Sequence, residues 1–311
     1  MKRRNDASTK TVSPPLHEPH EVPPGRLIEL PGRGTTFVRE LGGPSGAPAV
    51  ILLHGILGTA GTNWLTTMGR LGQRFRVLAL DLRGHGRGIR PKKRFRLADN
   101  ADDVAALASE LGISRAIVGG YSMGGPIAQL TWQRHRALVS GLVFAATSYQ
   151  FIHGAQARVF LSSWAAWGAQ TTRAAEIAGR VPWRVARGFV PTLVPTSGSL
   201  GRWGADEMRR HHPRSVIEAS REISVYDAGS WIGDVDVPTA VVLTTRDNAV
   251  EPLWQLRLAR AIRGAAVHPI DDGHVTCGTT LFGEVFTDAC VEVAERVAVP
   301  AREAIAPNHR R

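Results

Sequence analysis

The sequence predicts an α/β fold with helices on both faces of a mostly parallel sheet and an inserted helical cap. Apolar runs of strand length alternate with segments of helical pattern, and the continuous run 49–53 suits a parallel strand covered on both faces. With 311 residues, 43% of them hydrophobic, the chain can bury one sizeable core. The alternation stops at residue 148 and resumes at 235, so we expect a core of residues 26–147 and 235–299 around a cap at 148–234.

Both ends of the chain have compositions that predict loose segments. Residues 1–25 combine several prolines with polar side chains, which bury too little area to offset the entropy of ordering. The tail 300–311 is short and polar. Basic residues at 2–4 are followed by no apolar run, so no signal peptide is expected.

The strands are predicted where short apolar or β-branched runs end in turn-forming residues. The first two surround a turn at 31–34, and the others are continuous apolar runs. In chain order the predicted strands are 27–30, 35–38, 49–53, 75–80, 116–118, 139–146, 237–245 and 265–270.

Helices are predicted between these strands from their apolar periodicity. Asn63 is expected to cap the first helix and Asp99 the second, while Gly112 is placed to end the second helix. The predicted helices are 64–73, 99–111, 127–136, 253–262 and 279–297.

Composition limits the classes of binding partner and the cellular compartment that we expect for this chain. The formal net charge is +11, mostly from arginine, which either reflects a GC-rich coding sequence or serves an anionic surface or substrate. The chain has no recognisable nucleic-acid-binding module, so no nucleic-acid partner is expected. Its two cysteines form neither a disulfide framework nor a metal site, so we expect a reducing, cytoplasmic setting without a metal. No apolar run approaches the roughly 18 residues that span a bilayer.

The stretch Gly120–Gly124 reads Gly-Tyr-Ser-Met-Gly, the pattern of a nucleophile elbow around Ser122. It lies between an apolar run at 116–118 and a helix-like segment, which is the strand–turn–helix context that an elbow needs. Glycines two residues before and after the serine let the neighbouring backbones approach closely. With 33 glycines in the chain the motif alone could arise by chance, so it needs catalytic partners.

A serine nucleophile needs a general base and an acid that orients the base. In a doubly wound sheet these residues come from loops at the carboxyl ends of strands. Asp247 and His274 follow the last two predicted strands, which gives the chain order Ser122, Asp247, His274. Asp271 and Asp272 are rivals for the acid, but they lie only three and two residues from the histidine, too close in sequence to reach the far side of its ring.

Four other histidines are given no catalytic role. We expect His54 to support the loop that follows it and His85 to belong to a structured turn at 81–86. His211 and His212, in a charged part of the cap, are expected to be solvated.

An oxyanion hole needs two backbone N–H groups aimed where negative charge develops. Met123 directly follows the nucleophile at a helix start, where N–H groups lack partners. The loop after the 49–53 strand is expected to supply the second donor, from Ile56.

Taken together, these motifs resemble those of the α/β-hydrolase fold superfamily. They are His54-Gly55, the sequence at 81–86, the elbow, Asp247 and Gly273-His274, in the expected order. The resemblance covers roughly residues 48–146 and 236–298, and it implies an eight-stranded sheet, a cap after the sixth strand, a Ser–His–Asp triad and no metal or organic cofactor.

The activity expected from this resemblance is carboxylic ester hydrolysis through an acyl-enzyme. A serine nucleophile argues against the superfamily's epoxide hydrolases and haloalkane dehalogenases, and Val275 stands where its carbon–carbon-bond hydrolases often have tryptophan. An acyltransferase, a carbon–carbon-bond hydrolase and a slow-turnover ligand sensor remain as alternatives. The sequence indicates no oligomeric state.

The cap and one loop suggest the type of substrate. Trp164, Trp167 and Phe151 are the candidates to line an apolar pocket for a hydrophobic ester, although aromatic residues also serve helix packing. The loop at 83–96 carries seven cationic side chains, which could steer anionic or membrane-borne esters or could simply be solvated.

Overall fold

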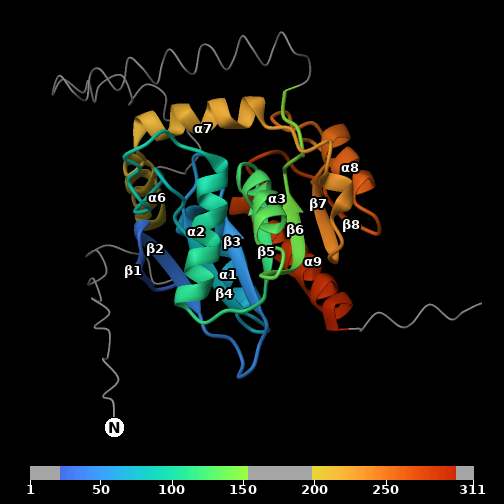
Figure 1. Ribbon diagram of the computed structural model, residues 1–311, viewed down its shortest axis with the longest axis horizontal. Coiled ribbons are helices and arrows are strands. Elements are labelled where there is room, and N and C mark those ends of the chain that lie inside the picture. Colours follow the sequence, from blue (N-terminus) through green and yellow to red (C-terminus); the bar gives the residue numbers. More distant parts are fainter. Residues whose placement is uncertain (1–21, 153–197, 299–311) are drawn as a thin grey trace, which may run out of the picture.

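The computed structural model describes residues 22–152 and 198–298 (Figure 1). An eight-stranded sheet has the order β1-β2-β4-β3-β5-β6-β7-β8. β1 pairs antiparallel with β2 and β2 antiparallel with β4, while all other neighbours are parallel. The strands are β1 (Gly25–Leu30), β2 (Gly34–Leu41), β3 (Ala49–Leu53), β4 (Arg76–Leu80), β5 (Ala116–Tyr121), β6 (Val139–Ala145), β7 (Thr239–Thr244) and β8 (Ala266–Ile270). The mostly parallel sheet predicted from the sequence is confirmed.

Helices cover both faces of the sheet. α1 packs with α9 over one face, through a core that contains Trp64, Phe282 and Phe286. α2, α3 and α8 share the core of the other face. The helices are α1 (Ala60–Leu71), α2 (Leu97–Glu110), α3 (Gly124–Arg134), α6 (Gly198–Arg209), α7 (Pro213–Val225), α8 (Pro252–Ala261) and α9 (Thr280–Ala298), with short 3₁₀ turns η2 (Ile232–Asp234) and η3 (Thr276–Gly278). No helix in the described ranges is long and apolar enough to cross a membrane.

The central strands are buried along their whole length. Every residue of β3, β5 and β7 is buried, as expected for parallel strands with helices on both sides. All parallel strands end at the same edge of the sheet, so the loops after β3, β5, β7 and β8 meet there. This edge therefore collects the residues singled out in the sequence.

Two predicted helix starts are wrong. α1 begins three residues earlier than its expected cap, because Thr59 is the N-cap and accepts a hydrogen bond from Thr62 N–H at 3.2 Å. Asn63 instead accepts from Gly55 N–H at 3.0 Å. α2 begins after Arg96, which makes no side-chain cap.

The predicted end of α2 is correct. Gly112 has φ +65°, a left-handed conformation that suits glycine just beyond a helix. The next amide, Ile113 N–H, donates to the Ala108 carbonyl at 2.8 Å, which closes the last turn.

Helix α7 of the proposed cap segment and its N-cap residue contact the loop that precedes α2. Glu218 of α7 accepts a hydrogen bond from Phe95 N–H at 2.7 Å, and His212 N–H donates to the Gly84 carbonyl at 2.8 Å. In Figure 1, α7 crosses above the carboxyl ends of the strands. Much of the predicted cap, residues 153–197, lies outside the described ranges.

Candidate active site

Ser122 lies on a strained turn between β5 and α3. Its φ is 50°, in the left-handed region that residues with a side chain rarely adopt. A Cβ added at Gly120 would collide with the Gly124 carbonyl, and one added at Gly124 would collide with the Leu53 carbonyl. Thr147 Oγ1 donates to the Ser122 carbonyl at 2.8 Å. The glycine positions and this hydrogen bond hold the serine at the carboxyl edge of the sheet.

The structure brings the three residues of the predicted triad together. Ser122 Oγ lies 3.0 Å from His274 Nε2, and His274 Nδ1 lies 2.8 Å from Asp247 Oδ2. Because a carboxylate only accepts, Nδ1–H donates to Asp247 and Nε2 is left to accept from the serine hydroxyl. This is the arrangement in which an imidazole can take a proton from serine.

Asp247 is buried and surrounded by hydrogen-bond donors. Its Oδ1 accepts from Ala249 and Val250 N–H at 2.8 Å each, and its Oδ2 accepts from Thr244 Oγ1 at 2.9 Å. Burial raises the pKa of Asp247, but the hydrogen bonds from His274 and from Val250 N–H outweigh burial and lower it below its ordinary value. The carboxylate is therefore held ionised beside the imidazole.

Two of the supports of Asp247 were missed by the sequence prediction. Thr244 is the last residue of β7, and Gln255 lies in α8. Gln255 Nε2 donates to Thr244 Oγ1 at 2.7 Å and to Asp247 Oδ2 at 3.3 Å. A polar residue one turn into the helix that follows an acidic loop is the only sequence signal that could have indicated this contact.

The loop that carries His274 is held from beneath by Tyr121, the residue before the nucleophile. The Tyr121 hydroxyl donates to the His274 carbonyl, and the two rings are 5.9 Å apart between centroids. Neither rival acid contacts the imidazole. Asp271 is exposed and pairs with Arg246 at 3.0 Å, while Asp272 accepts from the next backbone N–H at 2.7 Å.

The loop after β3 approaches the nucleophile from the other side. A Cβ added at Gly55 would lie 3.4 Å from Ser122 Cβ, so the glycine permits close contact. The predicted oxyanion donors, Ile56 N–H and Met123 N–H, have no acceptor among the described residues. Both therefore remain available to a negatively charged oxygen, and their catalytic role stays a prediction.

His54 supports the loop that follows it, as predicted. Its Nδ1 donates to the Gly55 carbonyl at 2.7 Å, and its Nε2 accepts from Leu82 N–H at 2.9 Å. Burial lowers the pKa of His54 to about 3, so the ring is neutral and has no proton-transfer partner in the site. His85 Nδ1 lies 2.8 Å from the Arg83 carbonyl, within the predicted turn.

The expectation that His211 and His212 are solvated is wrong. His211 is half-buried between Gly86 N–H, 3.1 Å from its Nδ1, and the Leu57 carbonyl, 3.1 Å from its Nε2. His212 caps α7 by accepting from Ser215 N–H. Contacts with loops that are distant in sequence partly bury the ring of His211. Charge composition does not reveal such contacts.

The predicted pocket aromatics are mostly outside the described residues. Trp164 and Trp167 lie in the segment that is not described, and Phe151 is half-buried after β6. Two other tryptophans of the cap segment pack against the core: Trp203 is 7% exposed, and Trp231 stacks on Trp132 with centroids 6.2 Å apart.

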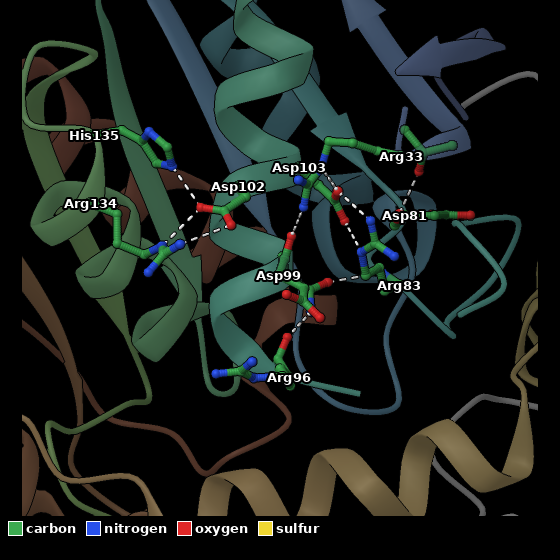
Figure 2. A network of polar contacts seen from close by, with 11 residues as sticks. Arg33, Asp81, Arg83, Arg96, Asp99, Asp102, Asp103, Arg134 and His135 are labelled. Atoms are coloured by element: carbon green, nitrogen blue, oxygen red, sulfur yellow. Dashed lines mark hydrogen bonds and ion pairs between the residues drawn. The ribbon is translucent and has the colours of Figure 1, made fainter. Parts of the chain in front are cut away.

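The basic loop at 83–96 is tied to acidic residues of this chain. Figure 2 shows Arg83 and Arg33 converging on Asp103 of α2. Three ion pairs link the loop to helices: Arg83–Asp103, Arg87–Glu207 at 2.6 Å and Arg94–Glu222 at 2.9 Å. The first pair joins the loop to α2, and the other two join it to α6 and α7. Together they occupy three of the cations that the sequence offered for substrate steering.

Figure 2 also shows a second ionic cluster around Asp102 of α2. Arg134 and His135, at the end of α3, both contact its carboxylate, at 2.8 Å and 2.9 Å. This cluster joins two helices and lies apart from the serine site. Within the described ranges, no group of three His, Cys, Asp or Glu side chains is arranged to hold a metal ion.

Comparison with known proteins agrees with the fold. A family model described as the alpha/beta hydrolase fold matches residues 48–184. An uncharacterized protein of Mycobacterium tuberculosis is 38% identical over 96 residues, which is 31% of this chain and 28% of that protein. A 2-(acetamidomethylene)succinate hydrolase of Mesorhizobium japonicum is 36% identical over 99 residues, 32% of this chain and 34% of the hydrolase. The matched segments thus span about a third of these relatives or less.

A solved structure extends the likeness to most of the chain. A thermophilic esterase from Thermogutta terrifontis superposes with a TM-score of 0.68 at 22% identity, covering 89% of this chain and all of the esterase. At this identity the likeness concerns the fold. The family model, the strand order and the elbow between β5 and α3 lead to one conclusion: the chain has the α/β-hydrolase fold.

Proposed function

We propose that this protein is a serine hydrolase that cleaves carboxylic esters through an acyl-enzyme intermediate. The observation that carries the proposal is the pair of contacts from Ser122 Oγ to His274 Nε2, at 3.0 Å, and from His274 Nδ1 to Asp247 Oδ2, at 2.8 Å. A serine hydroxyl becomes a useful nucleophile when a neighbouring base accepts its proton.

The reaction follows from these contacts in two steps. Ser122 Oγ attacks the ester carbonyl while His274 Nε2 takes its proton, and Asp247 stabilises the imidazolium that forms. The imidazolium returns the proton to the leaving alkoxide, and the alcohol departs. Water, deprotonated by His274, then attacks the acyl-serine, which releases the carboxylic acid and restores the serine.

The oxyanion of each tetrahedral intermediate would bind to Ile56 N–H and Met123 N–H. Loss of one such donor costs about 3 kcal/mol of barrier. Because both donors are backbone groups, their position depends on the two loops and not on the side chains of these residues. The conformation of the loop after β3 is therefore part of the catalytic machinery in this proposal.

We also propose hydrophobic esters as the substrate class. Phe151 follows β6 at the carboxyl edge of the sheet, where the serine lies, and the cap segment after it is rich in tryptophan. Apolar pockets with a few polar groups are typical of sites for small hydrophobic molecules. Contact with an anionic membrane, and a cytoplasmic location, remain predictions from the sequence.

The test is hydrolysis of p-nitrophenyl esters of increasing acyl length by the full chain and by Ser122→Ala. We expect turnover that rises from acetyl to medium-length acyl groups in the unmodified protein and falls to the uncatalysed rate in Ser122→Ala. Ser109→Ala, at an exposed position of α2, serves as the matched control and should keep full activity. Undiminished hydrolysis by folded Ser122→Ala would remove the serine from the mechanism.

A further inference from the structure

His211 joins the connection between α6 and α7 to the loop that carries the predicted oxyanion donor. A backbone N–H can only donate, so Gly86 N–H, 3.1 Å from Nδ1, makes this nitrogen the acceptor. The proton must then be on Nε2, which donates to the Leu57 carbonyl at 3.1 Å. The two backbone contacts thus define one tautomer of a neutral ring.

The hydrogen bond to Leu57 acts on the oxyanion donor through two peptide planes. In a trans peptide the carbonyl of one residue and the N–H of the next point in opposite directions. Holding the Leu57 carbonyl therefore directs Gly58 N–H the other way, where it donates to the Gly55 carbonyl at 3.0 Å. Holding the Gly55 carbonyl in turn directs Ile56 N–H away from it.

His54 acts on the same acceptor from within the loop. Its Nδ1 donates to the Gly55 carbonyl at 2.7 Å, so this oxygen receives one hydrogen bond from His54 and one from Gly58. Only the hydrogen bond from Gly58 depends on the Leu57–Gly58 peptide that His211 holds. The loop therefore has a local support, His54, and a remote one from the segment between α6 and α7.

The ring of His211 is held in place by other aromatic groups. It packs edge-on against His85 with centroids 5.2 Å apart, and His85 lies 5.5 Å from His54 in the same way. Burial lowers the pKa of His211 to about 4, which keeps the ring in the neutral form that its two backbone contacts need.

We propose that His211 is a positioning residue for the oxyanion hole, acting through the Leu57 carbonyl on the orientation of Ile56 N–H. This inference rests on the proposed serine-hydrolase function for its catalytic consequence. The residue touches neither the substrate nor the reacting atoms. Its effect should therefore fall on stabilisation of the tetrahedral intermediate and leave substrate binding nearly unchanged.

Two conservative variants separate the two contacts of the ring. The terminal nitrogen of glutamine reaches about as far as histidine Nε2, so His211→Gln can keep the hydrogen bond to Leu57. The amide of asparagine reaches only as far as Nδ1, so His211→Asn can keep the contact with Gly86 and must lose the one with Leu57. If His211 only held the α6–α7 connection against Gly86, asparagine would replace it at least as well as glutamine.

The measurements are kcat, KM and the affinity for a trifluoromethyl ketone that forms a charged tetrahedral adduct. Because removal of an oxyanion donor costs about 10²- to 10³-fold in kcat, we expect misorientation in His211→Asn and His211→Ala to cost about 10- to 100-fold, with KM within about 2-fold. His211→Gln should recover most of kcat and adduct affinity. His135→Ala, which changes a half-buried histidine at the end of α3, is the control.

Hydrogen exchange of the Gly58 amide provides a readout that needs no activity. We expect faster exchange in His211→Asn and His211→Ala than in His211→Gln or the unmodified protein, because only the first two lose the bond to Leu57. If the unmodified protein neither hydrolyses esters nor reacts with a fluorophosphonate, the proposed function fails, and the exchange data still judge the loop contact. Equal exchange in all variants, or equal rescue of kcat by asparagine and glutamine, overturns the proposal.

Discussion

The two sides of Ser122 are held by different chemistry. On one side, the ionised carboxylate of Asp247 holds His274. Five groups donate to that carboxylate, from Ala249, Val250, Thr244, Gln255 and His274 itself. On the other side, neutral imidazoles hold the backbone of the loop after β3. The difference fits the proposed mechanism, in which the first side stabilises a positive charge on His274 and the second side directs backbone N–H groups at a negatively charged oxygen.

The two sides also differ in how far their supports lie along the chain. Asp247 is supported by residues of its own loop and the adjoining ends of β7 and α8, which are close in sequence. The loop after β3 is supported by Asn63, one turn into α1, and by His211, 154 residues from its contact at Leu57. Substitutions on the two sides should therefore differ in how strongly they lower activity or stability, and in how that loss depends on pH.

The largest effect is expected on the carboxylate side. Asp247→Asn removes the charge that stabilises the imidazolium and allows the wrong tautomer of His274, so kcat should fall about 10⁴-fold. Steady-state ester hydrolysis measures this loss. Asp271→Asn, an exposed carboxylate of the same sheet edge, should change kcat little. Comparable losses in the two variants would show that the acid has been misidentified.

A second prediction concerns stability between pH 6.5 and pH 4. The folded pKa of His211, about 4, lies below its ordinary value of 6.5, so the unfolded chain binds the extra proton in this window. The free energy of unfolding must then decrease as the pH falls through it, by up to about 3 kcal/mol for a shift of this size. His211→Gln removes this contribution, so its stability should decrease less steeply.

Urea unfolding of both proteins at several pH values between 4 and 7 checks this difference. Asp81 works in the opposite direction, since burial raises its pKa to about 6 and favours the protonated folded state. It is present in both proteins, so it cancels in the comparison. Identical slopes for the two proteins would mean that the ring of His211 is solvated after all.

The smallest effect is expected from a substitution at Thr244, one of the residues that donate a hydrogen bond to the Asp247 carboxylate. Thr244→Val keeps the shape of the side chain and removes one hydrogen bond to Asp247, which should lower kcat about 2- to 10-fold. KM should stay unchanged because this residue lies behind the acid. A loss as large as that of Asp247→Asn would contradict the view that several donors share the task.

The sheet, and the fact that Ser122, Asp247 and His274 lie together at its edge, could be predicted from sequence because their signals are local. Continuous apolar runs mark buried parallel strands, and the carboxyl ends of such strands meet at one edge. Once the elbow fixes Ser122, the chain order requires a strand-end carboxylate followed by a strand-end histidine. His274 satisfies it, and Asp247 is favoured over Asp271 and Asp272 because these two lie so close to the histidine in sequence.

Other features depend on contacts that composition does not encode. Thr59 and Asn63 both have side chains that can cap a helix, and only the position of Gly55 decides that the second binds the loop. The basic residues of the loop at 83–96 find Asp103, Glu207 and Glu222 in three different helices. His211 is polar and flanked by charged residues, yet it lies between two loops that are far away in sequence.

The most direct test of the account is to map the residue that a fluorophosphonate modifies in the full chain. The contact between Ser122 Oγ and His274 Nε2 predicts one adduct per chain, on the peptide that contains Ser122. It also predicts that Asp247→Asn slows formation of this adduct while Asp271→Asn does not. An adduct on a different residue, or ester turnover with Ser122 unmodified after complete reaction, would contradict the central claim.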